Sequence, residues 1–366
     1  MDDFEGLLRL NMISGIGIKT FLNLIEHLGS VRSILDCPKS RLERIPGIGP
    51  KIADKIINGS KAADVDKEIK LAERNSVKIV PFTSDEFPHN LKLIYDPPLV
   101  LYIKGDIIKS DTVALAIVGA RRCSYYGQSQ AERFAIQLAQ AGFCVVSGMA
   151  RGIDTSVHTG AIKGKGRTIA VLGCGLGAVY PRENTELAEK IASQGAVISE
   201  LPMATPPSNR NFPPRNRIIS GLSLGVLVVE STLWSGSLIT AKWALEQGKE
   251  VFAIPGNIDS NYSRGTNKLI KEGAKLVEDI NDIVEELGPL AEAIYIKDNI
   301  KVEDIRSLSL NSQENKIFSL LSSTPKAIDE ITTESGLPVS NVSSILMILE
   351  VKRLVKQLSG KRFVKA

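Results

Sequence analysis

Two turns that follow predicted strands combine glycine with arginine, a pairing that suits the binding of anions. One turn follows the apolar run 113–118 and the other follows the apolar run 143–146. The candidate anion-binding residues are Gly119, Ala120, Arg121 and Arg122 in the first turn, and Gly148 and Arg151 in the second. In a parallel sheet both turns lie at the carboxyl edge, where such folds bind ligands. Glycines let backbone N–H groups approach an anion there, and the N-terminus of a following helix favours negative charge. The repetition favours a phosphate-rich ligand over the alternative, two ordinary tight turns with solvated arginines.

Further cations and an aromatic ring follow later strands. Arg182 comes shortly after the predicted strand 168–172, and the loop 201–217 holds Arg210, Arg215 and Arg217 around Phe212. Basic side chains around an aromatic ring suit single-stranded nucleic acid, because cations neutralise phosphates while a base stacks on the ring. The alternative is a stiff, proline-rich connection whose phenylalanine is buried.

Two more strand ends lead into predicted helices through small polar residues. Ser235, Gly236 and Ser237 precede the helix 238–247, and Lys268 lies at the start of a helix that follows the strand 250–254. A helix N-terminus is a favourable place for an anion. The serines are equally expected as simple helix caps.

The elements that must position these turns alternate regularly between residues 112 and 286. Short apolar strands are predicted at 113–118, 143–147, 168–172, 196–199, 225–230, 250–254 and 274–277, with helices such as 128–141 and 183–193 between them. Two further short strands are predicted at 77–81 and 99–103. This alternation predicts an α/β fold with a doubly wound, mostly parallel sheet.

Smaller modules are predicted on both sides of this sheet. Residues 1–63 contain a repeat, 13–19 and 45–51, in which a Gly-apolar-Gly turn opens a helix; it resembles the helix-hairpin-helix (SAM-like) motif. Residues 64–287 form the sheet domain, residues 288–312 a linker, and residues 313–366 a winged-helix domain. Whether the repeat touches DNA stays open, as does the ligand of the winged helix.

Composition and missing motifs exclude several classes of function. The 366 residues carry a net charge of +4, and the four cysteines and three histidines form no metal-ligand spacing, so we expect no metal and no disulfide framework. The loop 173–177 looks like a dinucleotide loop but does not open a helix, so no cofactor is expected. No P-loop and no nucleophile elbow occur. An acidic N-terminus and the lack of a long apolar run predict a cytoplasmic protein without a membrane segment.

Seven blocks in the same order resemble the DNA-processing protein A (DprA/Smf) family. They read AIVGARRCSYYG, SGMARGID, TIAVLGCGLGAVYPREN, ISELP, NFPPRNRIISGLS, VVESTLWSGSLITAKWALEQGKEVFAIPG and GTNKLIKEGA. The resemblance implies a Rossmann-like domain that binds single-stranded DNA without being an enzyme. It further implies a homodimer that protects incoming DNA during natural transformation and loads a RecA-type recombinase onto it.

The resemblance also implies roles for particular residues. Gly119, Ala120 and Arg121 would hold phosphates, while Arg182, Phe212 and Arg215 lie in motifs implicated in the family. Ala120 replaces a serine or threonine often present there, which removes one hydroxyl donor. Two rivals remain: a nucleoside-monophosphate N-glycosidase using Glu200 or Glu230 as its acid, and a double-stranded DNA regulator acting through the winged helix.

Overall fold

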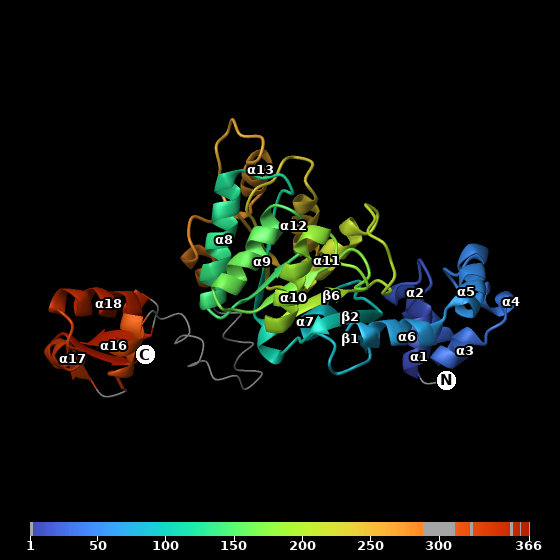
Figure 1. Cartoon of the computed structure of the whole chain (residues 1–366), viewed down its shortest axis with the longest axis horizontal. Coiled ribbons are helices and arrows are strands. Elements are labelled where there is room, and N and C mark those ends of the chain that lie inside the picture. Colours follow the sequence, from blue (N-terminus) through green and yellow to red (C-terminus); the bar gives the residue numbers. More distant parts are fainter. Residues whose placement is uncertain (1–2, 288–311, 323–324, 352–353, 359, 366) are drawn as a thin grey trace. The chain divides into compact units, whose positions relative to one another are not determined.

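The computed structural model describes residues 3–287, 312–322, 325–351, 354–358 and 360–365 (Figure 1). The chain divides into two compact units, which are described separately. The larger unit contains nearly all residues up to 287, and the described residues from 312 onward belong to the smaller one. Nearly all of the expected linker 288–312 therefore lies outside the described residues.

The larger unit is built on a nine-stranded sheet with the strand order β1-β2-β6-β5-β4-β3-β7-β8-β9. The seven strands from β6 to β9 in this order are parallel, and β2 and β1 are added antiparallel at one edge. The strands are β1 (Val77–Pro81), β2 (Val100–Gly105), β3 (Ala114–Val118), β4 (Cys144–Ser147), β5 (Thr168–Val171), β6 (Ala196–Ser199), β7 (Gly225–Val228), β8 (Glu250–Ala253) and β9 (Lys275–Leu276). This confirms the predicted doubly wound α/β fold, with most strand limits within two residues of the prediction.

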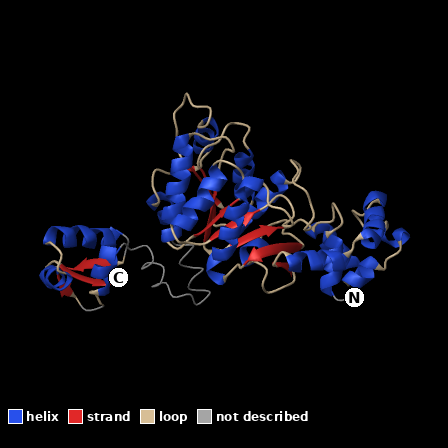
Figure 2. Cartoon of the chain, viewed as in Figure 1, coloured by secondary structure: helices blue, strands red, loops and turns tan. Residues whose placement is uncertain are grey.

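Helices enclose the parallel strands (Figure 2). Every residue of β3, β4, β5 and β6 is buried, as expected for parallel strands covered on both faces. The covering helices are α8 (Tyr125–Gln140), α9 (Ile153–Lys163), α10 (Thr185–Gln194), α11 (Phe212–Leu222), α12 (Gly236–Glu246) and α13 (Arg264–Lys271). Between β3 and β7 the strand order reverses its direction, and such a switch point leaves a crevice at the carboxyl ends of the strands.

One helix differs from the prediction. The segment 201–217 was expected to be a loop throughout, but α11 begins at Phe212. Pro213 and Pro214 occupy its first turn, where a helix needs no backbone N–H donor, so these prolines start the helix instead of preventing it.

Six helices precede the sheet and belong to the same unit. They are α1 (Asp3–Asn11), α2 (Ile18–Leu28), α3 (Val31–Leu35), α4 (Lys39–Leu42), α5 (Pro50–Ala62) and α6 (Val65–Arg74). The repeat places α2 after Gly17 and α5 after Gly49, as predicted. The turns need glycine at Gly15 and Gly47, whose φ angles are +89° and +80°. A short helix, α7 (His89–Lys92), lies between β1 and β2.

The smaller unit has a hydrophobic core of its own, to which Ile317, Ile331, Leu346 and Phe363 contribute. Its elements are α16 (Ser312–Ser319), β10 (Lys326–Ala327), α17 (Ile328–Ser335), α18 (Val339–Val351), β11 (Val355–Leu358) and β12 (Arg362–Lys365). Three helices with a small antiparallel sheet form the predicted winged-helix arrangement. In the part of the chain that the structure describes, no helix is both long enough and apolar enough to cross a membrane.

Candidate nucleic-acid interface

A cavity of about 640 Å³ lies at the carboxyl edge of the parallel strands. Its walls come from the turn after β3, the first turns of α11 and α12, and the loop before α13. Nine residues predicted from the sequence line it: Gly119, Ala120, Arg121, Arg122, Phe212, Arg215, Ser235, Gly236 and Ser237. The fold therefore gathers residues that are separated by more than a hundred positions. The turns after β3 and β7 lie at the switch point, and α11 crosses back from β6 to β7.

The turn after β3 is held tightly against its neighbours. A Cβ on Gly119 would lie 2.6 Å from the side chain of Ile153, so only glycine lets the turn approach α9 this closely. The backbone N–H of Ala120 donates to the carbonyl oxygen of Glu230 at 2.8 Å. That amide therefore has a partner within the fold, which leaves the exposed side chains of Arg121 and Arg122 as the donors of this turn.

Arg121 is exposed and lies over an aromatic pair. Its guanidinium carbon is 4.7 Å from the centre of the Phe212 ring, a cation–π distance. Phe212 is stacked in turn on Tyr180, with ring centres 5.9 Å apart and an angle of 27° between the ring planes. A Cβ on Gly173 would lie 2.6 Å from Phe212, so the glycine-rich loop after β5 makes room for this ring. The glycine at 173 is therefore explained by its packing against Phe212, without a bound dinucleotide.

Arg215 lines the cavity but is not an exposed cation. It is only 5% exposed, and its Nη1 donates to the carbonyl oxygens of Gly148, at 2.7 Å, and Val171. Burial lowers the pKa of Arg215 to about 10, while the carboxylate of Asp154 nearby opposes this shift. Burial also raises the pKa of Asp154. The sequence-based role of Arg215 as a freely accessible phosphate ligand is therefore not what the structure shows; it supports the ends of β4 and β5.

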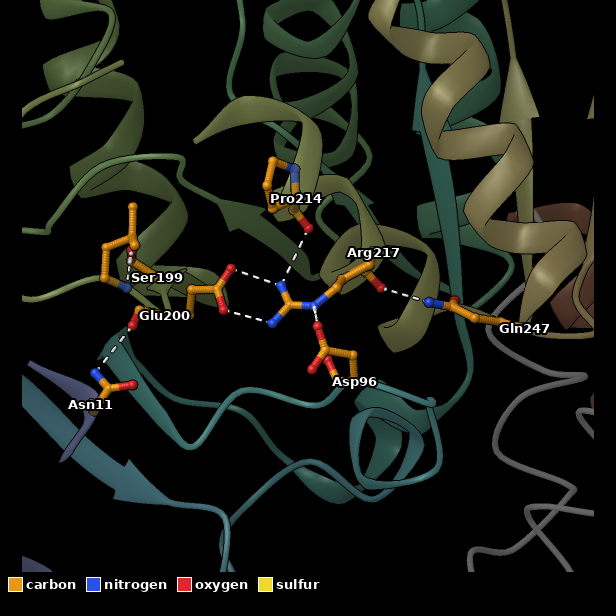
Figure 3. A network of polar contacts seen from close by, with 8 residues as sticks. Asn11, Asp96, Ser199, Glu200, Pro214, Arg217 and Gln247 are labelled. Carbon is orange, nitrogen blue, oxygen red and sulfur yellow. Dashed lines mark hydrogen bonds and ion pairs between the residues drawn. The ribbon is translucent and has the colours of Figure 1, made fainter. Parts of the chain in front are cut away.

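Arg217 is also buried, and its guanidinium group binds other groups of the protein (Figure 3). Its guanidinium donates to both carboxylate oxygens of Glu200 and to the carbonyl oxygen of Asp96. With its donors used inside the protein, Arg217 does not line the cavity. The structure therefore gives Arg217 a role inside the fold, in place of the exposed position that its predicted phosphate contact assumes.

The serines at the start of α12 cap the helix, as the alternative interpretation of these residues predicted. The Oγ of Ser235 accepts a hydrogen bond from the backbone N–H of Ser237, and the Oγ of Ser237 donates to Ser231. Gly236 has no atom within 4 Å of the place that a Cβ would take. The first turn of α12 therefore faces open space in the cavity, and its N-terminal dipole favours an anion there.

Four predicted residues lie outside the cavity lining besides Arg217. Gly148 lies beneath it against Arg215, and Arg182 is exposed two residues after Tyr180. Arg151 forms an exposed ion pair with Glu183, and Lys268 pairs with Glu272 at 3.6 Å.

Two aromatic residues of the site were not predicted from the sequence: Tyr180, which supports Phe212, and Tyr262, which lines the cavity. The sequence Tyr-Pro-Arg at 180–182 was the available signal for Tyr180, whereas Tyr262 had none.

The carboxylates considered as catalytic acids have partners within the fold. Glu230 accepts hydrogen bonds from the backbone N–H and the hydroxyl of Ser124 at 2.9 and 2.5 Å, and Glu200 is bound by Arg217. His158 is fully buried, its Nδ1 lies 2.8 Å from the hydroxyl of Thr168, and burial lowers its pKa to about 3. Among the described residues, no group of His, Cys, Asp and Glu has the arrangement of a metal site.

Comparison with known families matches three segments of the chain. The model for the family described as DNA recombination-mediator protein A matches residues 78–288. The DprA winged helix domain matches residues 306–361, and the SAM-like helix-hairpin-helix tandem matches residues 6–62.

Individual relatives agree with these matches. Protein Smf of Escherichia coli is 38% identical over 79% of this chain and 77% of its own length. The X-ray structure of DNA processing protein A from Streptococcus pneumoniae is 35% identical, with a TM-score of 0.68 over 78% of this chain and 98% of that one. DNA processing protein A from Helicobacter pylori, whose structure concerns its single-stranded DNA binding mode, is 30% identical, with a TM-score of 0.52 over 58% of this chain and 95% of that one.

Proposed function

This chain belongs to the DNA recombination-mediator protein A family, and we propose that it binds single-stranded DNA in the cavity at the carboxyl edge of its parallel sheet. The relative from Helicobacter pylori, for which a single-stranded DNA binding mode is described, supports this ligand. The chemistry of the cavity agrees with it, because cations, an aromatic ring and a helix N-terminus meet there.

The observation that carries the proposal is the position of Arg121 over Phe212 at the cavity wall. A single strand presents a phosphate and an unpaired base in each nucleotide. Arg121 offers a charge to the phosphate, and Phe212, held by Tyr180, offers a ring to the base. A duplex keeps its bases stacked inside, so this arrangement favours a single strand.

The other residues of the site contribute to binding in three different ways. Arg122 and Arg182 are exposed and add positive charge around Arg121. Ser235, Gly236 and Ser237 present the N-terminus of α12 to a phosphate. Gly148 and the two buried arginines hold the walls in place. Three exposed arginines, Arg121, Arg122 and Arg182, then determine the electrostatic part of the affinity.

We further propose that the chain binds DNA without reacting with it, since the candidate acids Glu200 and Glu230 are engaged inside the fold. The family's description as a recombination mediator supports a role in natural transformation: protecting incoming DNA and loading a RecA-type recombinase onto it. A homodimer in the cytoplasm is part of the same proposal.

Fluorescence anisotropy with a labelled oligo-dT and its duplex, over a series of salt concentrations, tests the DNA site. We expect the single strand to bind more tightly, with log K falling against log salt with a slope of about −2 for three neutralised phosphates. Arg121→Ala is expected to weaken binding and make the slope shallower. Lys242→Ala removes an equal charge from an exposed position on α12 and serves as the matched control. Preferred binding of the duplex, or equal effects of the two variants, would contradict the proposal.

A further inference from the structure

A tryptophan points into solvent beside the cavity. Trp234 lies in the loop between β7 and α12 and is 94% exposed. An indole is among the largest apolar side chains, and leaving it in water forgoes the free energy of burial. Neither of the sequence-based roles of this loop, capping and anion binding, requires it.

The loop that carries Trp234 is firmly anchored. The backbone N–H of Ser231 donates to the carbonyl oxygen of Tyr262 at 2.7 Å, and the N–H of Gly265 donates to the carbonyl oxygen of Ser231 at 2.7 Å. A tight turn follows, in which the N–H of Ser235 donates to Thr232 at 3.2 Å. The indole is therefore displayed on a loop whose two ends are fixed by hydrogen bonds.

The neighbours of Trp234 place it at the rim of the cavity. Thr232 and Ser235, on either side of it in the loop, both line the cavity, and so does Tyr262 after β8. Phe212 instead contacts the turn after β5, at Gly173, and Arg121 after β3. Because β3 lies between β5 and β8 in the strand order, aromatic rings flank Arg121 on both sides along the sheet edge, toward β5 and toward β8.

On the basis of the proposed single-strand binding, we propose that Trp234 stacks on a base and gives the strand a second aromatic platform. The strand then runs along the carboxyl edge from the side of β5, past Arg121, to the side of β8. Nucleic-acid bases stack on exposed aromatic rings irrespective of sequence. A protein partner is the other class of ligand that an exposed tryptophan could contact; the position between two cavity-lining residues favours DNA.

Binding by Trp234→Ala and Trp234→Phe tests the inference with oligo-dT and with an abasic strand of the same length. Loss of one stacked base is expected to weaken oligo-dT binding by roughly tenfold in Trp234→Ala, with most of the affinity retained in Trp234→Phe. The salt slope should stay as in the unmodified chain, because no phosphate contact is lost. Affinity for the abasic strand should not change.

Fluorescence gives a second readout. The chain has two tryptophans, so in Trp243→Phe the emission comes from Trp234 alone. Stacking predicts that oligo-dT quenches this emission and that the abasic strand does not. Unchanged affinity in Trp234→Ala, or absent quenching, while Arg121→Ala still weakens binding, would overturn the role of Trp234 and leave the DNA site standing. A chain that binds no single strand would overturn both, and a changed oligomeric state in Trp234→Ala with normal DNA binding would assign the residue to a protein contact instead.

Discussion

Arg217 on α11 donates two hydrogen bonds to the carboxylate of Glu200, with Nη1–Oε1 and Nη2–Oε2 distances of 2.7 and 2.6 Å. The pair joins the helix that carries Phe212 and Arg215 to the residue that follows β6. The carbonyl oxygen of Glu200 also accepts a hydrogen bond from Asn11 at the end of α1 (Figure 3). A residue expected to bind DNA instead fixes the helix that presents the binding residues.

Arg217→Met should therefore destabilise the fold, because it leaves the Glu200 carboxylate without its partner. We expect the free energy of unfolding in urea to fall by about 3 kcal/mol. Adding Glu200→Gln removes the unpaired charge, so the double variant should lose less than the sum of the two single losses. If Arg217→Met is as stable as the unmodified chain and its salt slope becomes shallower, Arg217 reaches the DNA after all.

Gly148 and Gly236 form a matched pair for testing how closely the cavity is packed. A Cβ on Gly148 would lie 2.7 Å from Nη2 of Arg215 and 2.8 Å from Oδ2 of Asp154, whereas one on Gly236 would meet nothing within 4 Å. Gly148→Ala should lower the free energy of unfolding by about 1–3 kcal/mol through overpacking. Gly236→Ala should leave stability nearly unchanged. Equal stability of the two variants would show that Arg215 moves aside freely.

The buried His158 predicts a loss of stability in mild acid. Its pKa is lowered to about 3 in the folded chain, chiefly by burial, so the unfolded chain takes up the proton first as the pH falls. The contribution of His158 is present above the unfolded pKa of about 6.5 and is lost as the pH falls from there toward 3, with about 2 kcal/mol lost by pH 5.

The free energy of unfolding in urea, measured at about pH 7 and at about pH 5, tests this effect. His158→Gln should show a smaller decrease in stability than the unmodified chain. The comparison separates His158 from Asp154, whose pKa is raised by burial and which acts in the opposite direction. An identical pH dependence in both chains would mean that His158 becomes protonated in the folded state.

The parallel sheet could be predicted from the sequence because its signal is local. Strands such as β4 and β7 are short apolar runs bounded by glycine or serine, and parallel strands need such runs because both faces are buried. The start of α11 could not be predicted in this way. Prolines usually indicate a loop, and only the first turn of a helix accommodates them.

The position of the candidate site could be predicted from the sequence, but the burial and the hydrogen-bond partners of each arginine could not. Turns that follow parallel strands meet at one edge, which brought Arg121 and Phe212 together as expected. Arg215 and Arg217 look equally exposed in the sequence. Their partners are the carbonyl oxygens of Gly148 and Val171 and the carboxylate of Glu200, at the ends of β4, β5 and β6. These residues are distant in the sequence, so the spacing of residues carries no information about them.

Removal of the chain after residue 312 tests whether the winged helix takes part in binding the single strand. The hydrophobic core of the smaller unit is formed by its own residues, so the larger unit should fold without it. Helix α18 also exposes Met347 and Ile348, apolar side chains that carry no charge for a phosphate. We expect the truncated chain to keep its oligo-dT affinity and salt slope, and Arg121→Ala to weaken binding as much in the truncated chain as in the full one. Loss of binding on truncation, with the larger unit still folded by circular dichroism, would transfer the DNA site to the winged helix and favour a regulator of double-stranded DNA.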